Sequence, residues 1–152
     1  MYKHSKGFTL IELIATMVIA SILASSLITG YRTYNEWLKV NDEILNMVNT
    51  LRQARDYCME ANEKFYLTVT IGATDSYTLK YKDPTMDPLI LPGESSNVFT
   101  MPSFVDFTAS DVITDLEFNI LGEPSATKTI TINTDERTIT IVSPTGYIYA
   151  HN

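Results

Sequence analysis

The feature that most constrains the fold is an apolar run from Phe8 to Ile28, interrupted only by Glu12 and by small or hydroxyl-bearing residues. Coiled into a helix at about 1.5 Å per residue, this run spans roughly 30 Å, the thickness of the hydrocarbon core of a bilayer. Lys3 and Lys6 precede the run, and it contains no basic residue. By the positive-inside rule, this charge pattern predicts a cytoplasmic N-terminus and an exported C-terminal part.

Two ordinary explanations of the run conflict with Glu12. A secretory signal peptide needs a shorter apolar core and a small-x-small cleavage site. The stretch Ala24-Ser25-Ser26 could supply that site, but Glu12 lies where the core should be purely apolar. A plain membrane anchor leaves Glu12 unexplained, because a lone carboxylate costs a few kcal/mol in a membrane helix. Neither explanation accounts for Gly7, which separates the basic leader from Phe8.

The residues Lys6-Gly7-Phe8-Thr9-Leu10-Ile11-Glu12-Leu13 resemble the class III signal of type IV prepilins and pseudopilins. The resemblance implies that a membrane aspartyl prepilin peptidase cleaves the Gly7–Phe8 bond and methylates the new amine of Phe8. A glycine before the cut presents no side chain to the protease. The resemblance also implies that Glu12 forms an assembly salt bridge with the amine of a neighbouring subunit, so that two buried charges become one pair.

These features predict three parts of the chain. Residues 1–7 form a cleaved basic leader, residues 8–30 a half-helix for the membrane and the filament core, and residues 31–152 an exported pilin-like domain. Because no proline occurs between Gly7 and Asp83, the helix is expected to continue to a point before Phe65. An apolar stripe at helical spacing is predicted to be buried: Trp37, Val40, Ile44, Met47, Val48, Leu51, Ala54 and Cys58.

The opposite face of this helix carries Lys39, Asp42, Glu43, Asn46, Asn49, Arg52 and Asp56. We expect that face to be solvated, with contact to neighbouring subunits as the alternative.

Alternating residues beyond the helix predict strands at 65–71 and 77–82, shorter strands within 98–107 and 116–121, a hairpin of 129–132 with 137–141, and a last strand at 147–150. The expected fold is therefore α+β, a long N-terminal helix packed on a C-terminal antiparallel sheet.

Two features favour a minor subunit over the shaft of a filament. Phe118-x-x-x-Gly122, the hairpin that follows it and Gly146-Tyr147-Ile148 resemble the C-terminal half of type II secretion pseudopilin H and of fimbrial T-type minor pilins. Major pilins often carry a proline near the position of Thr29, where this chain has Thr29-Gly30. A glycine there weakens a helix by about 1 kcal/mol relative to alanine, so Gly30 is a candidate soft point.

The residues that catalysis or metal binding would need are scarce. The chain has one cysteine, Cys58, and two histidines, His4 in the leader and His151 at the C-terminal end, which argues against a histidine-based enzyme and against a zinc site. Oxygen ligands for calcium could come from Asp83 with Asp87 or from Asn133 with Asp135 and Glu136, although turn chemistry is the preferred explanation. A net charge of −7 disfavours direct nucleic-acid binding.

The sequence thus predicts a non-enzymatic structural subunit with no cofactor, a minor pilin or pseudopilin at the start or tip of a filament. The filament would belong to a pilus, a type II secretion system or a DNA-uptake (competence) system. Expected partners are the prepilin peptidase/N-methyltransferase, other pilin subunits, the inner-membrane assembly platform and, before assembly, the lipid bilayer. The expected location is the cytoplasmic membrane and then an extracellular or cell-envelope filament. The alternatives are a major pilin of the shaft and a membrane-anchored exported enzyme or binding domain.

Overall fold

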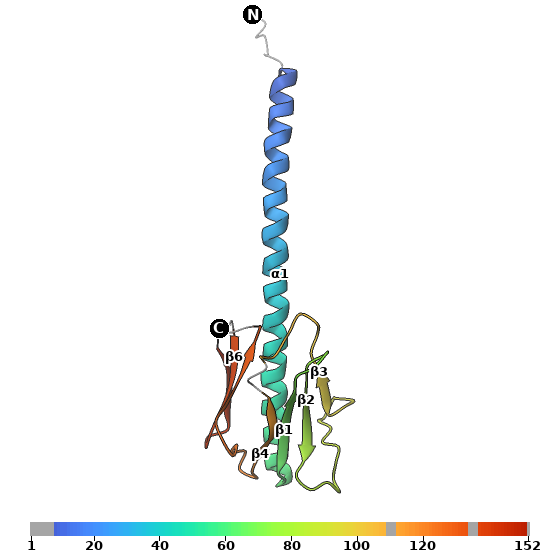
Figure 1. The fold of residues 1–152 in the computed structure, drawn as a ribbon, viewed down its shortest axis with the longest axis vertical. Helices are drawn as coiled ribbons and strands as arrows, with labels where there is room; N and C mark the ends of the chain where they lie inside the picture. The colour runs from blue at the N-terminus through green and yellow to red at the C-terminus, as the bar shows by residue number, and fades with distance from the viewer. Residues whose placement is uncertain (1–7, 109–111, 134–136, 152) are drawn as a thin grey trace, which may run out of the picture. The chain divides into compact units, whose positions relative to one another are not determined.

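The computed structural model describes residues 8–108, 112–133 and 137–151. Helix α1 (Leu10–Ala61) is followed by the strands β1 (Phe65–Thr70), β2 (Ser76–Tyr81), β3 (Val98–Thr100), β4 (Ile113–Phe118), β5 (Lys128–Ile132), β6 (Arg137–Val142) and β7 (Tyr147–His151) (Figure 1). The chain divides into two compact units, residues 1–39 and 40–152. The prediction of an α+β fold with one long N-terminal helix on antiparallel strands is confirmed.

Helix α1 ends in a backbone motif that needs no glycine. Asn62 adopts a left-handed φ of 57°. Its N–H donates to the carbonyl of Met59 at 3.2 Å, and the N–H of Glu63 donates to the carbonyl of Cys58 at 2.9 Å. This pair of bonds is the Schellman arrangement, in which asparagine tolerates the left-handed position. The helix therefore stops before Phe65, as predicted, and it passes through Gly30 as one element.

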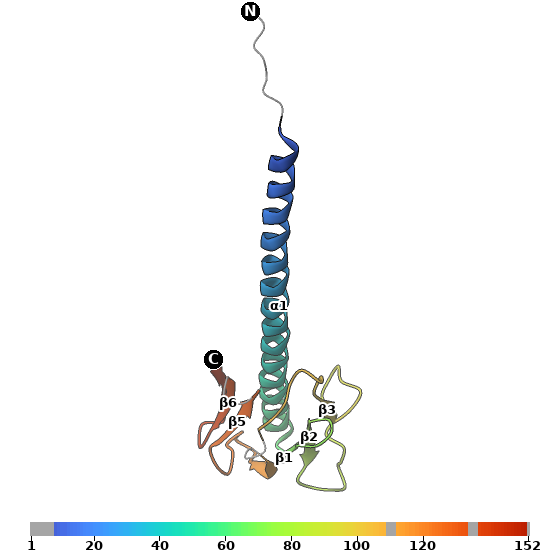
Figure 2. The same ribbon diagram turned by 45° about the horizontal axis from the view of Figure 1, so that its top comes forward.

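The unit of residues 40–152 packs the last part of α1 against two antiparallel sheets rather than the single sheet expected. Their strand orders are β3-β2-β1-β4 and β5-β6-β7. In both ribbon views the two sheets flank the C-terminal part of α1 (Figures 1 and 2). The predicted helix stripe is buried from Val40 onward, at Val40, Ile44, Met47, Val48, Leu51, Ala54 and Cys58. The prediction that Trp37 is buried was wrong: this side chain is 44% exposed, because the buried core begins only at Val40.

Strands β1, β2 and β4 place alternate side chains in the core. Phe65 of β1 pairs with Phe118 of β4, and their rings stack with centroids 4.4 Å apart. Strand β4 lies earlier than the predicted 116–121, because Ile113 pairs with Val69 across a register shift near Asp115 (φ 52°). Residues after Phe118 instead form a turn held by the side chain of Asn119.

The C-terminal hairpin confirms the predicted alternation. Strands β5 and β6 pair Ile130 with Ile139, and Ile130, Ile132, Ile139 and Ile141 are all buried. Strand β7 adds to β6 in the order predicted. Of the proposed turn, Asn133 is described, whereas Thr134, Asp135 and Glu136 lie outside the described residues.

Two side chains fix residues 101–108, which connect β3 to β4 and also touch the other sheet through a bridge of Phe107 to Ile132. Asp75, only 6% exposed, accepts hydrogen bonds from the N–H groups of Gly72 at 3.0 Å and Phe107 at 2.6 Å. Asn133 accepts one from the N–H of Asp106 at 2.9 Å. An unpaired buried carboxylate would be costly, so the two hydrogen bonds to Asp75 hold the turn at Gly72 and the segment at Phe107 together.

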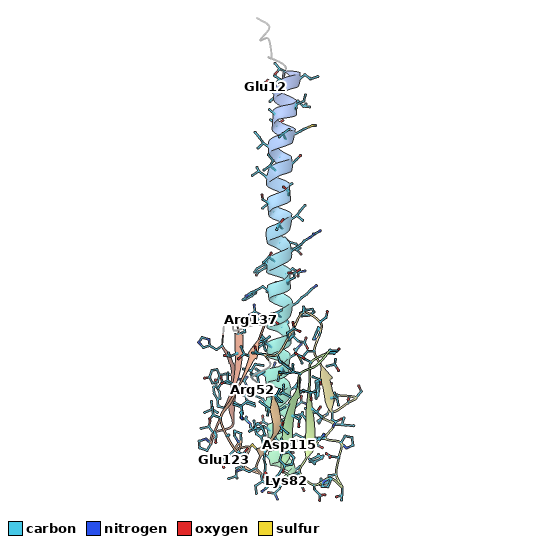
Figure 3. The ribbon with its side chains drawn as sticks, in the orientation of Figure 1. Glu12, Arg52, Lys82, Asp115, Glu123 and Arg137 are labelled. Atoms are coloured by element: carbon cyan, nitrogen blue, oxygen red, sulfur yellow. The ribbon has the colours of Figure 1, made fainter. Side chains whose placement is uncertain are left out.

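Two arginines of α1 bind the start of β7, which corrects the expectation that Arg52 is merely solvated. Arg52 donates from Nε (3.0 Å) and Nη2 to the carbonyl of Ile148, and Arg55 donates from Nη1 to the carbonyl of Gly146 at 2.7 Å. Figure 3 shows Arg52 beside the sheet that contains β6. A helix face can therefore be charged and still hold a sheet edge.

Gly122 and Gly146, the two glycines of the second resemblance, meet beneath Arg55. Both have a positive φ, 73° and 65°. A Cβ built on Gly146 would lie 2.0 Å from the carbonyl oxygen of Gly122, and one on Gly122 would lie 2.8 Å from Cγ of Arg55. A side chain at either position would collide with these neighbours. Close packing of the two turns therefore explains why glycine occupies positions 122 and 146.

Candidate membrane and assembly segment

The first part of α1 is an apolar helical surface with exposed side chains. Every residue from Phe8 to Tyr34 is exposed, including large apolar side chains such as Leu10, Ile11, Met17, Ile22 and Leu27. Figure 3 shows side chains projecting outward all around this part of the helix, with Glu12 at its start. A soluble surface rarely carries so large an apolar patch unless lipid or protein covers it. Within the described residues, α1 is the helix that is long and apolar enough to cross a membrane.

Thr9 and Glu12 form a reciprocal cap at the start of this helix. The Thr9 N–H and the Thr9 hydroxyl both donate to Oε2 of Glu12, at 3.0 and 2.9 Å. The Glu12 N–H in turn donates to Oγ1 of Thr9 at 3.3 Å. This is the capping box Thr-x-x-Glu, which pairs backbone N–H groups that a helix start otherwise leaves unpaired.

Thr9 is a residue that the sequence reasoning missed. Its Thr-x-x-Glu spacing before an apolar run is a recognised signal of a helix N-terminus, so the pattern was available in the sequence. The cap also gives the Glu12 carboxylate a favourable position, since the helix macrodipole is positive at the first turn.

The hydroxyl groups inside the apolar run are bonded within the helix. Thr16 donates to the carbonyl of Leu13, Ser21 to that of Met17, and Ser25 and Ser26 to that of Ile22, at distances of 2.8–3.2 Å. Such bonds let serine and threonine enter an apolar environment without an unpaired donor. The run can therefore lie in hydrocarbon along its whole length, apart from Glu12.

The predicted processing site is only partly within the described residues. Gly7 lies outside them, whereas Phe8 is described and is 81% exposed, directly before the capping threonine. The peptide bond expected to be cut therefore precedes the first capped turn of α1 by two residues.

The first candidate set for calcium is engaged in turns. Oδ1 of Asp83 accepts hydrogen bonds from the N–H and the hydroxyl of Thr85, at 2.9 and 2.7 Å, and these bonds lower the pKa of Asp83. Oδ1 of Asp87 accepts one from the N–H of Tyr81 at 2.8 Å. Asp135 and Glu136 of the other set lie outside the described residues. The described part of the chain contains no cluster of three or more metal-ligating side chains.

Comparison with known proteins places a recognised signal on this segment. Residues 2–28 match the family model described as the prokaryotic N-terminal methylation motif. The match covers the leader, the cap and the apolar run, and it indicates an exported subunit of the type IV pilin-like class. No curated protein and no solved structure shows significant similarity to the chain.

Proposed function

We propose that this chain is a structural subunit of a type IV pilus-like filament, and specifically a minor pilin or pseudopilin. The observation that carries the proposal is the apolar helical surface that begins directly within the methylation motif. It needs a bilayer before assembly and neighbouring helices afterwards. Exchanging lipid for protein contacts keeps that surface away from water throughout.

Processing is proposed to act on the Gly7–Phe8 bond. A prepilin peptidase removes residues 1–7, with Lys3 and Lys6, and leaves the apolar segment attached to the exported domain. The same enzyme methylates the amine of Phe8. Because the cut lies on the cytoplasmic side of the apolar run, the mature protein keeps its membrane anchor.

Glu12 is proposed to pair with the Phe8 amine of a neighbouring subunit during assembly. A charge buried alone among apolar helices is costly, and so is an unpaired amine, whereas the two together offset much of that cost. The two hydrogen bonds that Thr9 donates, from its N–H and its hydroxyl, both end on Oε2 of Glu12. A carboxylate has a second oxygen, so the cap and the intersubunit pair are compatible.

The processing proposal is tested by intact mass spectrometry of the membrane-bound protein. The wild type is expected to lack residues 1–7 and to be one methylene heavier than the trimmed chain. Gly7→Val should keep the leader, because a branched side chain then precedes the cut. Gly72→Val is the matched control, since a Cβ on Gly72 has no neighbour closer than 4.0 Å. An untrimmed wild type, or a trimmed Gly7→Val, contradicts the proposal.

The minor role is tested by stoichiometry in purified filaments. We expect few copies of this chain per filament, enriched at one end. If it makes up the bulk of the shaft, it is a major pilin.

A Glu12→Gln variant should be processed normally and yet fail to enter filaments. Normal incorporation of Glu12→Gln contradicts the pairing with Phe8 and leaves the processing proposal intact.

A further inference from the structure

Three aromatic side chains follow the apolar run on one face of α1. Tyr31, Tyr34 and Trp37 recur every third residue, and they are 70%, 60% and 44% exposed. The rings of Tyr34 and Trp37 stack at a centroid distance of 6.2 Å and an interplanar angle of 8°. Gly30, which has no side chain, lies beside them in a shallow hollow lined also by Thr33. At about 100° per residue the three aromatics cover roughly a third of the helix circumference.

Their heights match a lipid headgroup layer. At about 1.5 Å per residue, the Cα of Tyr31 lies about 4.5 Å beyond that of Ile28, the end of the apolar run, and the Cα of Trp37 about 13.5 Å beyond it. Helical side chains lean over the preceding turn, which brings the ring of Trp37 back by about 5 Å toward Tyr34. The same lean brings the ring of Tyr31 to about the level of Ile28. The polar zone of one leaflet is about 5–8 Å thick, so the three rings extend from its inner to its outer margin.

We propose that Tyr31, Tyr34 and Trp37 form an interfacial anchor that binds the headgroup region of the outer leaflet while the apolar run spans the bilayer. The proposal rests on the membrane-inserted state assumed under the proposed function. Tyrosine and tryptophan suit this zone, because each combines an apolar ring with a polar group that hydrogen-bonds to headgroups and water. Arg32, exposed in the same turn, adds a cation that can reach lipid phosphates.

The order of residue types along α1 favours lipid over a partner helix at this face. Aliphatic side chains prevail up to Ile28, the aromatic residues at 31, 34 and 37 then alternate with the charged Arg32 and Glu36, and Lys39 follows. A purely aliphatic stretch followed by mixed aromatic and charged residues matches the passage from hydrocarbon to the headgroup layer of one leaflet. Large exposed rings beyond the end of the run are an anchor pattern.

Trp37 is the only tryptophan of the chain, so its fluorescence reports on this face directly. The experiment reconstitutes the full chain in phosphatidylcholine–phosphatidylglycerol vesicles with lipids brominated at a shallow or a deep position of the acyl chain. We expect Trp37 to be quenched more by the shallow bromines than by the deep ones, and to be partly shielded from acrylamide. A second reporter, Val18→Trp with Trp37→Phe, places the fluorophore near the middle of the apolar run and should be quenched more by the deep bromines.

The two reporters separate the failure of this proposal from failure of the proposed function. If Val18→Trp is quenched by neither lipid, the segment does not insert, and the membrane step of the proposed function fails. If Val18→Trp is quenched by deep bromines while Trp37 is quenched by neither lipid, insertion stands and the anchor is overturned. Shielding of Trp37 only in assembled filaments assigns this face to neighbouring subunits and also overturns the anchor.

Variants of the two tyrosines test whether the rings act together. Tyr31→Ser with Tyr34→Ser should reduce the shallow quenching of Trp37 at least twofold and increase its access to acrylamide. Tyr31→Phe with Tyr34→Phe, which keeps the rings, is the matched control and should retain most of the quenching. An unchanged depth of Trp37 in the double serine variant excludes the tyrosines from the anchor and contradicts the proposal as stated.

Discussion

The contact between Gly146 and Gly122 makes a sharp prediction about stability. A Cβ added at Gly146 would lie 2.0 Å from the carbonyl oxygen of Gly122 and 3.3 Å from Cδ of Arg55. The nearer atom is backbone and cannot rotate away. Gly146 also has a φ of 65°, which disfavours any residue with a Cβ. Gly146→Ala therefore meets a conformational cost and a steric one at the same site.

Other glycines of the chain separate the two costs. Gly93 has a φ of 92° and nothing within 4 Å of a built Cβ, so Gly93→Ala carries the conformational cost alone, about 1–2 kcal/mol. Gly146→Ala adds an overpacking cost of about 1–3 kcal/mol, for a total loss of about 2–5 kcal/mol. Gly72→Ala, whose φ is not in the left-handed region and whose nearest neighbour is at 4.0 Å, should change stability little or increase it slightly.

Urea denaturation of the full chain in detergent, followed by near-ultraviolet circular dichroism of its tyrosines, measures the three differences. The expected order of stability is Gly72→Ala, then Gly93→Ala, then Gly146→Ala. A loss of a few kcal/mol is large beside the total stability of a typical domain, about 5–15 kcal/mol. If Gly146→Ala costs no more than Gly93→Ala, the two turns do not touch as described, and the packing reason given for the glycine pattern is refuted.

Three further predictions concern the domain of residues 40–152. Arg52→Ala removes two donors to the Ile148 carbonyl and should lower the free energy of unfolding, measured in urea, by about 1.5–3 kcal/mol. The exposed control Asn49→Ala should change it by less than about 0.5 kcal/mol. Equal effects of the two variants contradict the hydrogen bonds from Arg52 to β7. Burial raises the pKa of the Cys58 thiol to about 12, so a disulfide reagent at neutral pH should label it only after denaturation, and rapid native labelling argues against the buried stripe. The hydrogen bond from Lys82 lowers the pKa of Glu117 and raises that of Lys82, so this pair stabilises the fold between the two ordinary pKa values and loses its effect at more acidic or more alkaline pH. In Lys82→Met the loss of stability at acidic pH, measured by thermal melts across pH, should therefore be smaller than in the wild type. An unchanged loss at acidic pH contradicts the pairing.

Local patterns in the sequence were sufficient to predict most of the fold. The isoleucine–threonine alternation predicted β5 and β6, because a strand that buries one face leaves a period of two in the chain. The stripe from Val40 to Cys58 predicted the buried face of α1 for the corresponding reason at a period near 3.6. The end of that stripe could not be predicted, since periodicity continues through Trp37 and only tertiary contact shows where the core begins.

Long-range contacts explain the other differences. Arg52 and the β7 carbonyl of Ile148 are 96 residues apart, and nothing in the helical pattern distinguishes Arg52 from its solvated neighbours. The approach of Gly122 to Gly146 likewise depends on two turns brought together by separate sheets. The candidate segment was more predictable, because the methylation motif and the candidate membrane span lie in consecutive residues. The capping role of Thr9 was missed, and cleavage at Gly7–Phe8 and the pairing of Glu12 stay predictions.

The capping box also explains why an acidic residue suits the place of Glu12, the fifth residue of the apolar run, better than another place in it. At the third residue of the helix, the Glu12 carboxylate accepts from the Thr9 N–H and faces the positive end of the macrodipole. Its charge is therefore partly compensated in the unassembled chain, which lowers the cost of holding it near hydrocarbon. The proposed cut at Gly7–Phe8 would create an amine one residue before Thr9. In the pairing proposed for assembly, Oε1 of Glu12 would accept the amine of the neighbouring subunit while Oε2 keeps the bonds from Thr9 that orient the carboxylate.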